Sequence, residues 1–326
     1  MSTSSLEKLS PAQRVTRSIE IALQRGVRPW VKPWRDDACS GVPLLPRRAN
    51  GQPYRGVNIV ALWAAGLESG FASPFWFTFK QALALGGQVR KGERGAFVVF
   101  YKEMNAQSEG ESETEDDTKK AVRRILRGYV VFNRAQIDGL DDRFDAPQAP
   151  SSILDDAFAA CFAKVPATIC YGGARAFYAP SSDHVQLPPR SAFTDVTQFY
   201  ATLAHELTHW TRHPSRLDRD FGQKRFGDNG YALEELVAEL SAAFVGAVIG
   251  LPAEHVEDHA GYIQSWLTVL KDDPAAFLTA AAKAQTAADY LLELMGEAPA
   301  STPAAEMSCF GNNAAQTNQA ASAPAN

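Results

Sequence analysis

The most informative segment of this sequence is Leu203-Ala204-His205-Glu206-Leu207-Thr208-His209-Trp210-Thr211. His205 and His209 are four residues apart, so on a helix both imidazoles project from one face. Two imidazoles at this spacing suit one Zn²⁺ ion, and Glu206 beside them is placed to act as a general base toward a hydrolytic water. The segment therefore predicts a metal-binding helix over residues 196–212 and indicates a zinc-dependent hydrolase, most simply a metallopeptidase.

A zinc site of this kind needs a third protein ligand, and two segments offer one. His213 would extend the row of histidines, but Pro214 follows it and ends the helix. The metzincin continuation is absent, because Arg212 and Ser215 stand where its glycine and third histidine would be. The ligand is therefore more plausibly supplied by the next predicted helix, over residues 232–249.

That helix carries Leu-Glu-Glu-Leu-Val-Ala-Glu at residues 233–239. Glu235 and Glu239 are four apart and share a face, which resembles the carboxylate pair of gluzincin peptidases. The resemblance implies that Glu235 is the third ligand and that Glu239 orients a ligand histidine. Glu234 lies one position off that face, so we expect it to face solvent.

The chain has 326 residues, 45% hydrophobic and 21% charged, which is typical of a globular protein of two domains. No apolar run reaches the length of about 18 residues that a membrane span requires. The first residues lack the apolar core of a signal peptide, and the four cysteines have no CxxC spacing. We therefore expect a cytoplasmic protein with reduced thiols and no membrane contact.

Charge divides the chain into two unlike halves. Residues 1–102 carry 15 Lys and Arg against 6 Asp and Glu, whereas residues 129–326 carry 12 against 24. Aromatic residues alternate with the cations of the first half, a composition that suits single-stranded nucleic acid. Among the segments of the first half, the Gly-rich basic turn at residues 90–95 is the best candidate for binding the phosphate backbone. The candidate DNA contacts are Arg55, Trp76, Lys80, Arg90, Lys91 and Arg94.

The pattern of elements predicts an α+β protein of two domains. Residues 1–148 form a mixed α+β DNA-binding domain, in which strands at 96–101 and 127–132 flank a Glu/Ser-rich loop at 103–120 that we expect to be disordered. Residues 141–150 read as a linker, and residues 149–295 as a zincin-like (gluzincin) domain with strands at 176–178 and 185–187. Residues 296–326 are expected to be a disordered tail.

Several motifs occur in a fixed order along the chain. They are Tyr-Arg-Gly-Val-Asn-Ile (54–59), Trp-Phe-Thr-Phe-Lys-Gln-Ala (76–82), Gly-Gly-Gln-Val-Arg-Lys-Gly-Glu (86–93), Val-Phe-Asn-Arg-Ala-Gln (131–136), Asp-Gly-Leu (138–140), His-Glu-Leu-Thr-His-Trp (205–210) and Glu-Glu-Leu-Val-Ala-Glu (234–239). Over roughly residues 10–295 the chain thus resembles the ArdC-type antirestriction proteins of conjugative plasmids and related mobile elements.

This resemblance implies a single-stranded-DNA-binding domain followed by a zincin-like metallopeptidase domain with one Zn²⁺, or another divalent metal, per chain. It implies protection of incoming DNA from host restriction enzymes, with an unidentified protein substrate or restriction component as partner. Two alternatives stay open. The chain could coat single-stranded DNA with a structural or vestigial zinc site, or it could be an accessory protein of plasmid replication or priming.

Overall fold

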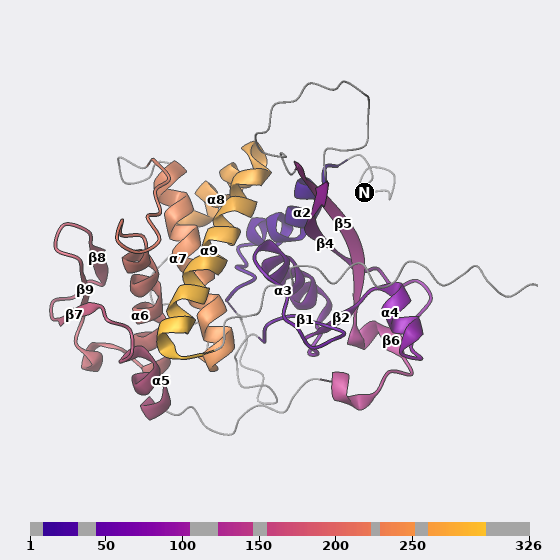
Figure 1. Ribbon diagram of the computed structural model, residues 1–326, viewed down its shortest axis with the longest axis horizontal. Coiled ribbons are helices and arrows are strands. Elements are labelled where there is room, and N and C mark those ends of the chain that lie inside the picture. The colour runs from indigo at the N-terminus through magenta and orange to yellow at the C-terminus, as the bar shows by residue number, and fades with distance from the viewer. Residues whose placement is uncertain are drawn as a thin grey trace, which may run out of the picture.

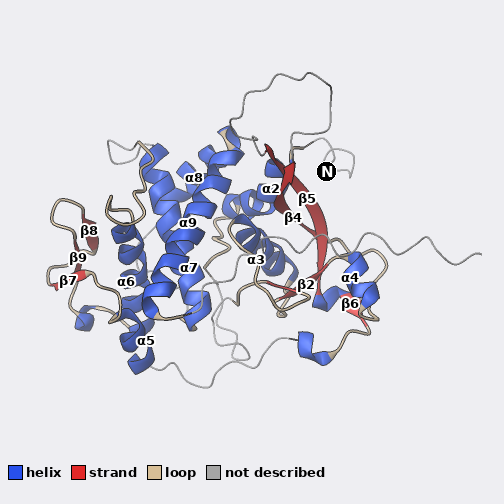
Figure 2. Cartoon of the chain, in the orientation of Figure 1, coloured by secondary structure: helices blue, strands red, loops and turns tan. Residues whose placement is uncertain are grey.

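The computed structural model describes residues 9–31, 44–104, 123–145, 155–222, 229–251 and 260–297. Two groups of strands lie at opposite ends of the molecule, with a layer of helices between them (Figures 1 and 2). In the described residues, no helix has the length and apolar character needed to cross a membrane. The helices are α2 (Pro11–Gln24), α3 (Val57–Ser69), α4 (Phe79–Ala84), α5 (Asp155–Phe162), α6 (Val196–Thr211), α7 (Asn229–Ile249), α8 (Ala260–Asp272) and α9 (Pro274–Met295).

The strands form three sheets. The first has the order β1-β2-β5-β4, the second pairs β3 with β6, and the third has the order β7-β9-β8. The strands are β1 (Arg47–Arg48), β2 (Phe75–Phe77), β3 (Gln88–Val89), β4 (Ala96–Met104), β5 (Arg123–Asn133), β6 (Ile137–Asp138), β7 (Thr168–Tyr171), β8 (Phe177–Ala179) and β9 (His184–Leu187).

Strands β4 and β5 form the predicted antiparallel hairpin, with Ala96 opposite Val131 and Met104 opposite Arg123. Both strands are longer than expected, and most of the acidic loop predicted as disordered lies outside the described residues. The free edge of β4 is covered by α3, because the Asn58 amide hydrogen-bonds to both the N–H and the C=O of Val99 at 2.8 Å. That bidentate contact fixes α3 against the sheet.

A second, smaller hydrophobic core lies beside the main one. It consists of Phe77, Ala82, Val89, Ile137, Leu140 and Phe144. We call the surrounding residues 77–94 and 133–145 the α4 lobe. It includes part of the segment that we expected to be a linker, and that expectation is wrong for residues 141–145. These residues form a 3₁₀ turn, Asp142–Phe144, because the Phe144 ring is buried against Phe75 and Phe77.

The α4 lobe is held by local capping and by one close approach. Thr78 caps α4 in a capping box with Gln81, in which each side chain accepts from the other residue's backbone N–H. Gly87 lies so near the β6 segment that a Cβ there would come 2.7 Å from Leu140 Cδ2. The lobe is therefore a packed unit, and α4 has a fixed orientation on it.

In the C-terminal domain α6 and α7 pack side by side over α9, and the β7-β9-β8 sheet lies against α6 (Figure 1). Strands β8 and β9 are the predicted pair, and β7 joins them in parallel with β9. The sequence did not indicate β7, because residues 168–171 are mostly exposed and show no clear alternation of buried and exposed positions. The helices predicted over residues 196–212 and 232–249 are present as α6 and α7.

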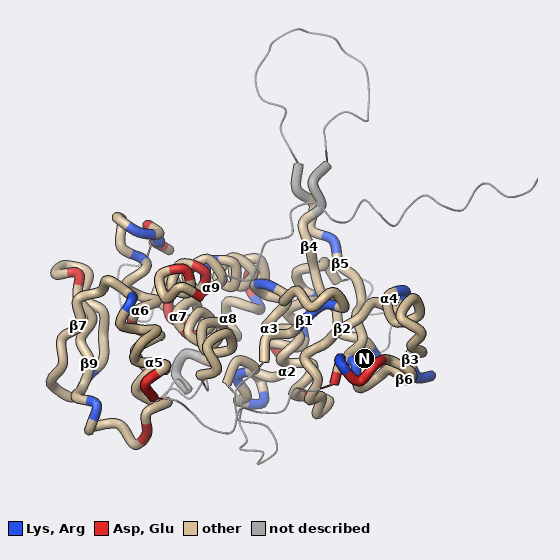
Figure 3. Tube along the Cα trace, turned by 60° about the horizontal axis from the view of Figure 1, so that its bottom comes forward, with Lys and Arg blue, Asp and Glu red and all other residues tan. Residues whose placement is uncertain are grey.

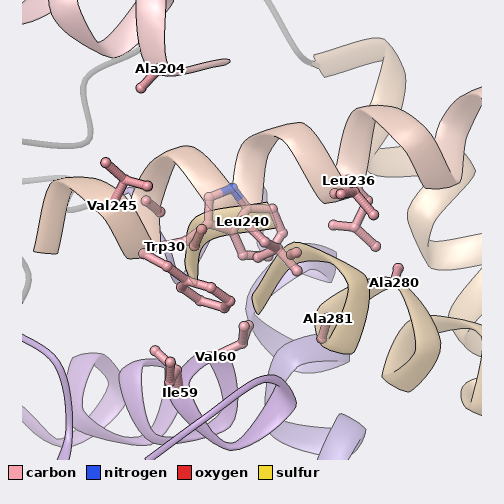
Figure 4. Close-up of a cluster of buried hydrophobic side chains, with 14 of the residues drawn as sticks. Trp30, Ile59, Val60, Ala204, Leu236, Leu240, Val245, Ala280 and Ala281 are labelled. Atoms are coloured by element: carbon pink, nitrogen blue, oxygen red, sulfur yellow. The ribbon is translucent and has the colours of Figure 1, made fainter. Parts of the chain in front are cut away.

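The two domains share one continuous hydrophobic core. Figure 4 shows Trp30, Ile59 and Val60 from the N-terminal domain against α7 and α9 residues of the C-terminal domain. The Trp30 ring meets Trp266 edge to face at a centroid distance of 5.5 Å. The sequence boundary near residue 148 is thus not a boundary in the packing, and the N-terminal half lies directly on the helix that carries Glu235.

Candidate metal centre and nucleic-acid interface

Helix α6 is capped at its N-terminus by Asp195, whose carboxylate accepts hydrogen bonds from the N–H groups of Thr197 and Gln198 at 2.8 and 3.0 Å. The motif lies in the last two turns, which α7, α9 and the third sheet cover. His205 and Glu206 are consequently buried, with 2% and 4% of their surface exposed. The histidine pair points toward α7.

His205, His209 and Glu235 converge, and a ligand atom from each lies within 4.8 Å of the other two. The two histidine Nε2 atoms are 3.2 Å apart. Glu235 places one carboxylate oxygen 3.5 Å from His205 Nε2 and the other 3.6 Å from His209 Nε2. The described residues contain no other group of three or more His, Cys, Asp or Glu with this proximity.

These separations fit a single metal ion. Four ligands at roughly 2.1 Å in a tetrahedron lie roughly 3.4 Å from one another, which is the range observed here. Two imidazoles with one carboxylate are a donor set used by catalytic zinc, and they leave a fourth position open. The residues present therefore fit a divalent ion with an accessible coordination position.

The carboxylate that contacts His209 is Glu234, which we had expected to face solvent. Glu234 Oε1 lies 3.1 Å from His209 Nδ1, and Glu234 is 1% exposed rather than solvent-facing. The expectation failed because the loop after α6 covers this side of α7 and brings Arg219 against Glu234. Both sides of α7 are buried here, so the helix has no solvent face at residue 234.

Arg219 completes this chain of contacts. Its guanidinium donates two hydrogen bonds to Glu234, from Nε and Nη2, both at 2.8 Å. It also donates to Thr208 O and Thr211 Oγ1 in the last turns of α6. The cation thus satisfies the Thr208 carbonyl near the C-terminus of α6 and fixes Glu234 against His209, a candidate metal ligand.

Glu239, which the gluzincin resemblance implies would orient a ligand histidine, also contacts the N-terminal domain. Its Oε2 accepts a hydrogen bond of 2.8 Å from Trp30 Nε1 and one of 3.2 Å from Arg28 Nη1. Glu239 lies one helical turn after Glu235, so the N-terminal domain contacts the ligand-bearing helix next to the metal site. Sequence reasoning gave no sign of this contact, since Arg28 and Trp30 precede α7 by about 200 residues.

The histidines and carboxylates of the site stabilise each other's charged forms, so a metal ion would have to displace the extra proton of His209. Burial opposes charge on His209, but the carboxylates of Glu235 and Glu234 outweigh it and raise the pKa of His209 to about 10. Burial would also raise the pKa of Glu234, yet hydrogen bonds from Arg219 and His209 lower that pKa to about 2. The histidines likewise hold the pKa of Glu235 well below its usual range despite burial. Both carboxylates are therefore ionised at neutral pH.

His213 does not join the cluster. It follows the end of α6, and its Nδ1 lies 2.8 Å from Ser215 Oγ in an exposed turn. The proline at residue 214 ends the helix as expected, so the ring leaves the face that carries His205 and His209. Of the two segments considered for the third ligand, the structure brings only Glu235 to the histidine pair.

The candidate DNA contacts separate into two groups. Trp76 is 3% exposed and packs in the main core against Phe71, so its ring is unable to stack on a base. Arg55 forms an ion pair with Asp289 of α9, which makes it part of the domain interface. Both are withdrawn as DNA contacts. The exposed candidates Lys80, Arg90, Lys91 and Arg94 all lie on the α4 lobe.

Comparison with family models supports this architecture. Residues 10–132 match the N-terminal domain of the anti-restriction factor ArdC, and residues 156–283 match a zincin-like metallopeptidase domain. The antirestriction ArdC protein from plasmid R388, in a metal-free crystal structure, is 41% identical with a TM-score of 0.70, and the match covers 87% of this chain and 97% of that chain. This chain belongs to the ArdC antirestriction family. The predicted family and two-domain α+β fold are confirmed.

Further comparisons concern a second structure of the R388 protein and two sequence relatives of this ArdC-family chain. A second crystal structure of the R388 protein, described as Mn(II)-bound, is 40% identical with a TM-score of 0.70 and covers 88% of this chain and 98% of that chain. The protein y4eC of Sinorhizobium fredii is 40% identical over 284 residues, which are 86% of this chain and 90% of y4eC. DNA primase TraC of Escherichia coli is 37% identical over 86% of this chain, which spans only 27% of TraC.

Proposed function

We propose that this ArdC-family chain is a metal-dependent peptidase of the gluzincin type that binds single-stranded DNA and protects incoming mobile-element DNA from restriction in the cytoplasm. The observation that carries the proposal is the convergence of His205, His209 and Glu235 beside a buried Glu206. A purely structural metal has no use for a buried general base next to its ligands. The target would be an unidentified host protein or restriction component.

The two histidines and Glu235 would hold one divalent ion, Zn²⁺ by donor set. When bound, the ion supplies a Lewis acid that acidifies a water and polarises a carbonyl group. Glu206 accepts the proton of the attacking water and delivers it to the leaving amine. Glu234 holds the proton of His209 on Nδ1, which keeps Nε2 available as a ligand atom.

Single-stranded DNA would bind on the N-terminal domain through cations that track phosphates, with Lys80, Lys91 and Arg94 as contacts. This binding would hold the peptidase site near proteins that act on entering DNA. Since the chain spans about a quarter of TraC, the priming activity in the TraC name is not carried over to it.

The proposal is tested by incubating the metal-loaded protein with purified restriction endonuclease subunits, with and without single-stranded DNA, and identifying new termini by mass spectrometry. We expect cleavage that depends on metal and is lost in Glu206→Gln, while that variant keeps its metal content. Equal cleavage by Glu206→Gln would remove Glu206 from the proposed role, and no cleavage of any subunit by wild type would count against a restriction subunit as the target.

A further inference from the structure

Helix α4 turns two large apolar side chains toward solvent. Phe79 is 50% exposed and Leu83 is 59% exposed. They are four residues apart, so they lie on one face of the helix, while Ala82, beside that face, is buried in the small core. Two neighbouring exposed apolar side chains on a fixed helix indicate a surface that contacts a partner.

Exposed cations lie on the same lobe as this apolar pair. Lys80 follows Phe79 directly, and Lys91 and Arg94 lie in the turn after β3, on the same lobe. All three are exposed, and no described acidic side chain forms an ion pair with them. Figure 3 shows basic positions at α4 and near the β3–β6 pair. A polyanion with apolar faces matches this arrangement better than an apolar partner does.

The turn at 90–94 is built to present its cations. Arg90 forms ion pairs with Glu93 at 3.0 Å and with Asp138 at 3.1 Å, so its guanidinium stabilises the turn. Glu93 also accepts a hydrogen bond of 2.9 Å from the Gln136 amide. Gly92 takes a φ of +91° at the tip, and the Lys91 side chain beside it is exposed. Two charged residues therefore hold the loop, while Lys91 and Arg94 face solvent.

We propose that the outward face of the α4 lobe is a stacking surface for single-stranded DNA, on which Phe79 and Leu83 contact bases and Lys80, Lys91 and Arg94 contact phosphates. The inference rests on the proposed DNA binding and assigns it a place and a base-contacting pair. Aromatic faces accept any base, so binding by this surface is tolerant of sequence and strongly dependent on salt. The capping box of Thr78 and the close packing at Gly87 hold Phe79 in position before DNA arrives.

The test measures binding of the full-length protein to a fluorescein-labelled oligothymidylate of 20 nucleotides over a range of salt concentrations. Phe79→Ala should weaken binding roughly tenfold or more, as loss of one stacked base does. Lys91→Gln should lower the slope of log affinity against log salt by about 0.7. Phe79 and Lys91 are exposed, so neither change is expected to affect folding, which circular dichroism verifies.

Two matched controls remove other exposed aromatic rings. Tyr101→Ala acts on the β4–β5 hairpin, where the ring is 63% exposed, and Tyr171→Ala acts on β7 of the C-terminal domain, where it is 59% exposed. Both should bind the oligonucleotide as wild type does. Loss of binding in Tyr101→Ala with wild-type affinity in Phe79→Ala would overturn the assignment and move the surface to the hairpin.

The other outcomes separate this inference from the proposed function. If wild type binds and Phe79→Ala binds equally well, the stacking surface is wrong and DNA binding stands. If wild type fails to bind at low salt, the proposed DNA binding itself is wrong. If Phe79→Ala combined with Leu83→Ser changes the sedimentation mass of the free protein, the face is a contact between copies of this chain, and the inference falls.

Discussion

At the scale of single residues, Glu235 carries the assignment of the third ligand. Its two carboxylate oxygens face His205 and His209 at 3.5 and 3.6 Å. Glu235→Ala should weaken zinc or manganese binding at least roughly tenfold, measured by competition with a chromophoric chelator. Glu293→Ala, which removes an exposed carboxylate of α9, serves as the control and should leave affinity unchanged. Unchanged affinity in Glu235→Ala would place the third ligand elsewhere.

A second prediction at the scale of residues concerns Glu234 and Arg219. Their contribution to the stability of the protein can be separated from their contribution to metal binding. Both side chains are 2% exposed, so Glu234→Ala leaves a buried guanidinium uncompensated and should cost about 3–5 kcal/mol of unfolding free energy. It should also weaken metal binding roughly 10- to 100-fold.

The double variant Glu234→Met with Arg219→Met removes both charges. It should recover much of the unfolding free energy in urea titrations while metal binding stays weak, since His209 Nδ1 still lacks its acceptor. Recovery of full metal affinity in the double variant would show that Glu234 acts only on stability.

The sequence predicted the His205–His209 pair because their spacing is a property of one helix, and Glu235 through the resemblance of its own helix to gluzincin peptidases. It did not predict Glu234 or Arg219 in their observed contacts. The face of α7 that is buried depends on the loop that ends α6, and no periodicity in the sequence describes that loop. A pair of adjacent glutamates on an apolar helix is a signal that both could be buried, and here both are.

At the scale of elements, the β4–β5 hairpin depends on Gly128. A Cβ at residue 128 would lie 2.1 Å from Phe97 Cζ, and the Arg14 guanidinium carbon already lies over that ring, 3.9 Å from its centroid. The ring therefore has little room to move, and Gly128→Ala should destabilise the protein by about 1–3 kcal/mol.

Gly66→Ala is the matched control for that change. Gly66 lies inside α3, and a Cβ there would meet its nearest neighbour at 3.9 Å, which is ordinary contact. Alanine has the higher helix propensity, so Gly66→Ala should stabilise the protein by up to about 1 kcal/mol. Thermal unfolding of both variants measures the difference, and equal midpoints would contradict the packing described for Phe97.

Long helices that carry the chemical motifs were the elements that the sequence described best. The helices expected over residues 196–212 and 232–249 correspond to α6 and α7. Short elements were described poorly, because β7 and the turn at Asp142–Phe144 depend on partners far away in the chain. The hairpin was predicted correctly since both of its strands are rich in β-branched and aromatic residues.

At the scale of the whole molecule, the hydrophobic core that the two domains share predicts that they unfold in one transition. Trp30 is 1% exposed between α3, α7 and α8, and it also donates a hydrogen bond to Glu239. Trp30→Ala should therefore cost about 3–5 kcal/mol. Far-ultraviolet circular dichroism and tryptophan fluorescence should report one coincident transition for wild type.

Two separated transitions would show that the halves are independent. The shared core also revises what we expect of residues 1–148 alone, which the charge pattern had suggested would bind DNA by themselves. Without α7 to α9, that segment would expose Trp30 and its neighbours to water, so binding studies require the full chain. Neither composition nor motif order indicated this, because sequence motifs locate domains but do not describe how one domain packs on another.

The most direct test of the account is DNA transfer into a host with an active restriction system. It compares wild type with Glu206→Gln at equal expression and equal metal content. We predict that wild type protects the entering DNA and that Glu206→Gln loses protection while still binding single-stranded DNA and metal. Full protection by Glu206→Gln would contradict the account, because the protein would then act by covering DNA and the metal site would have no catalytic part in antirestriction.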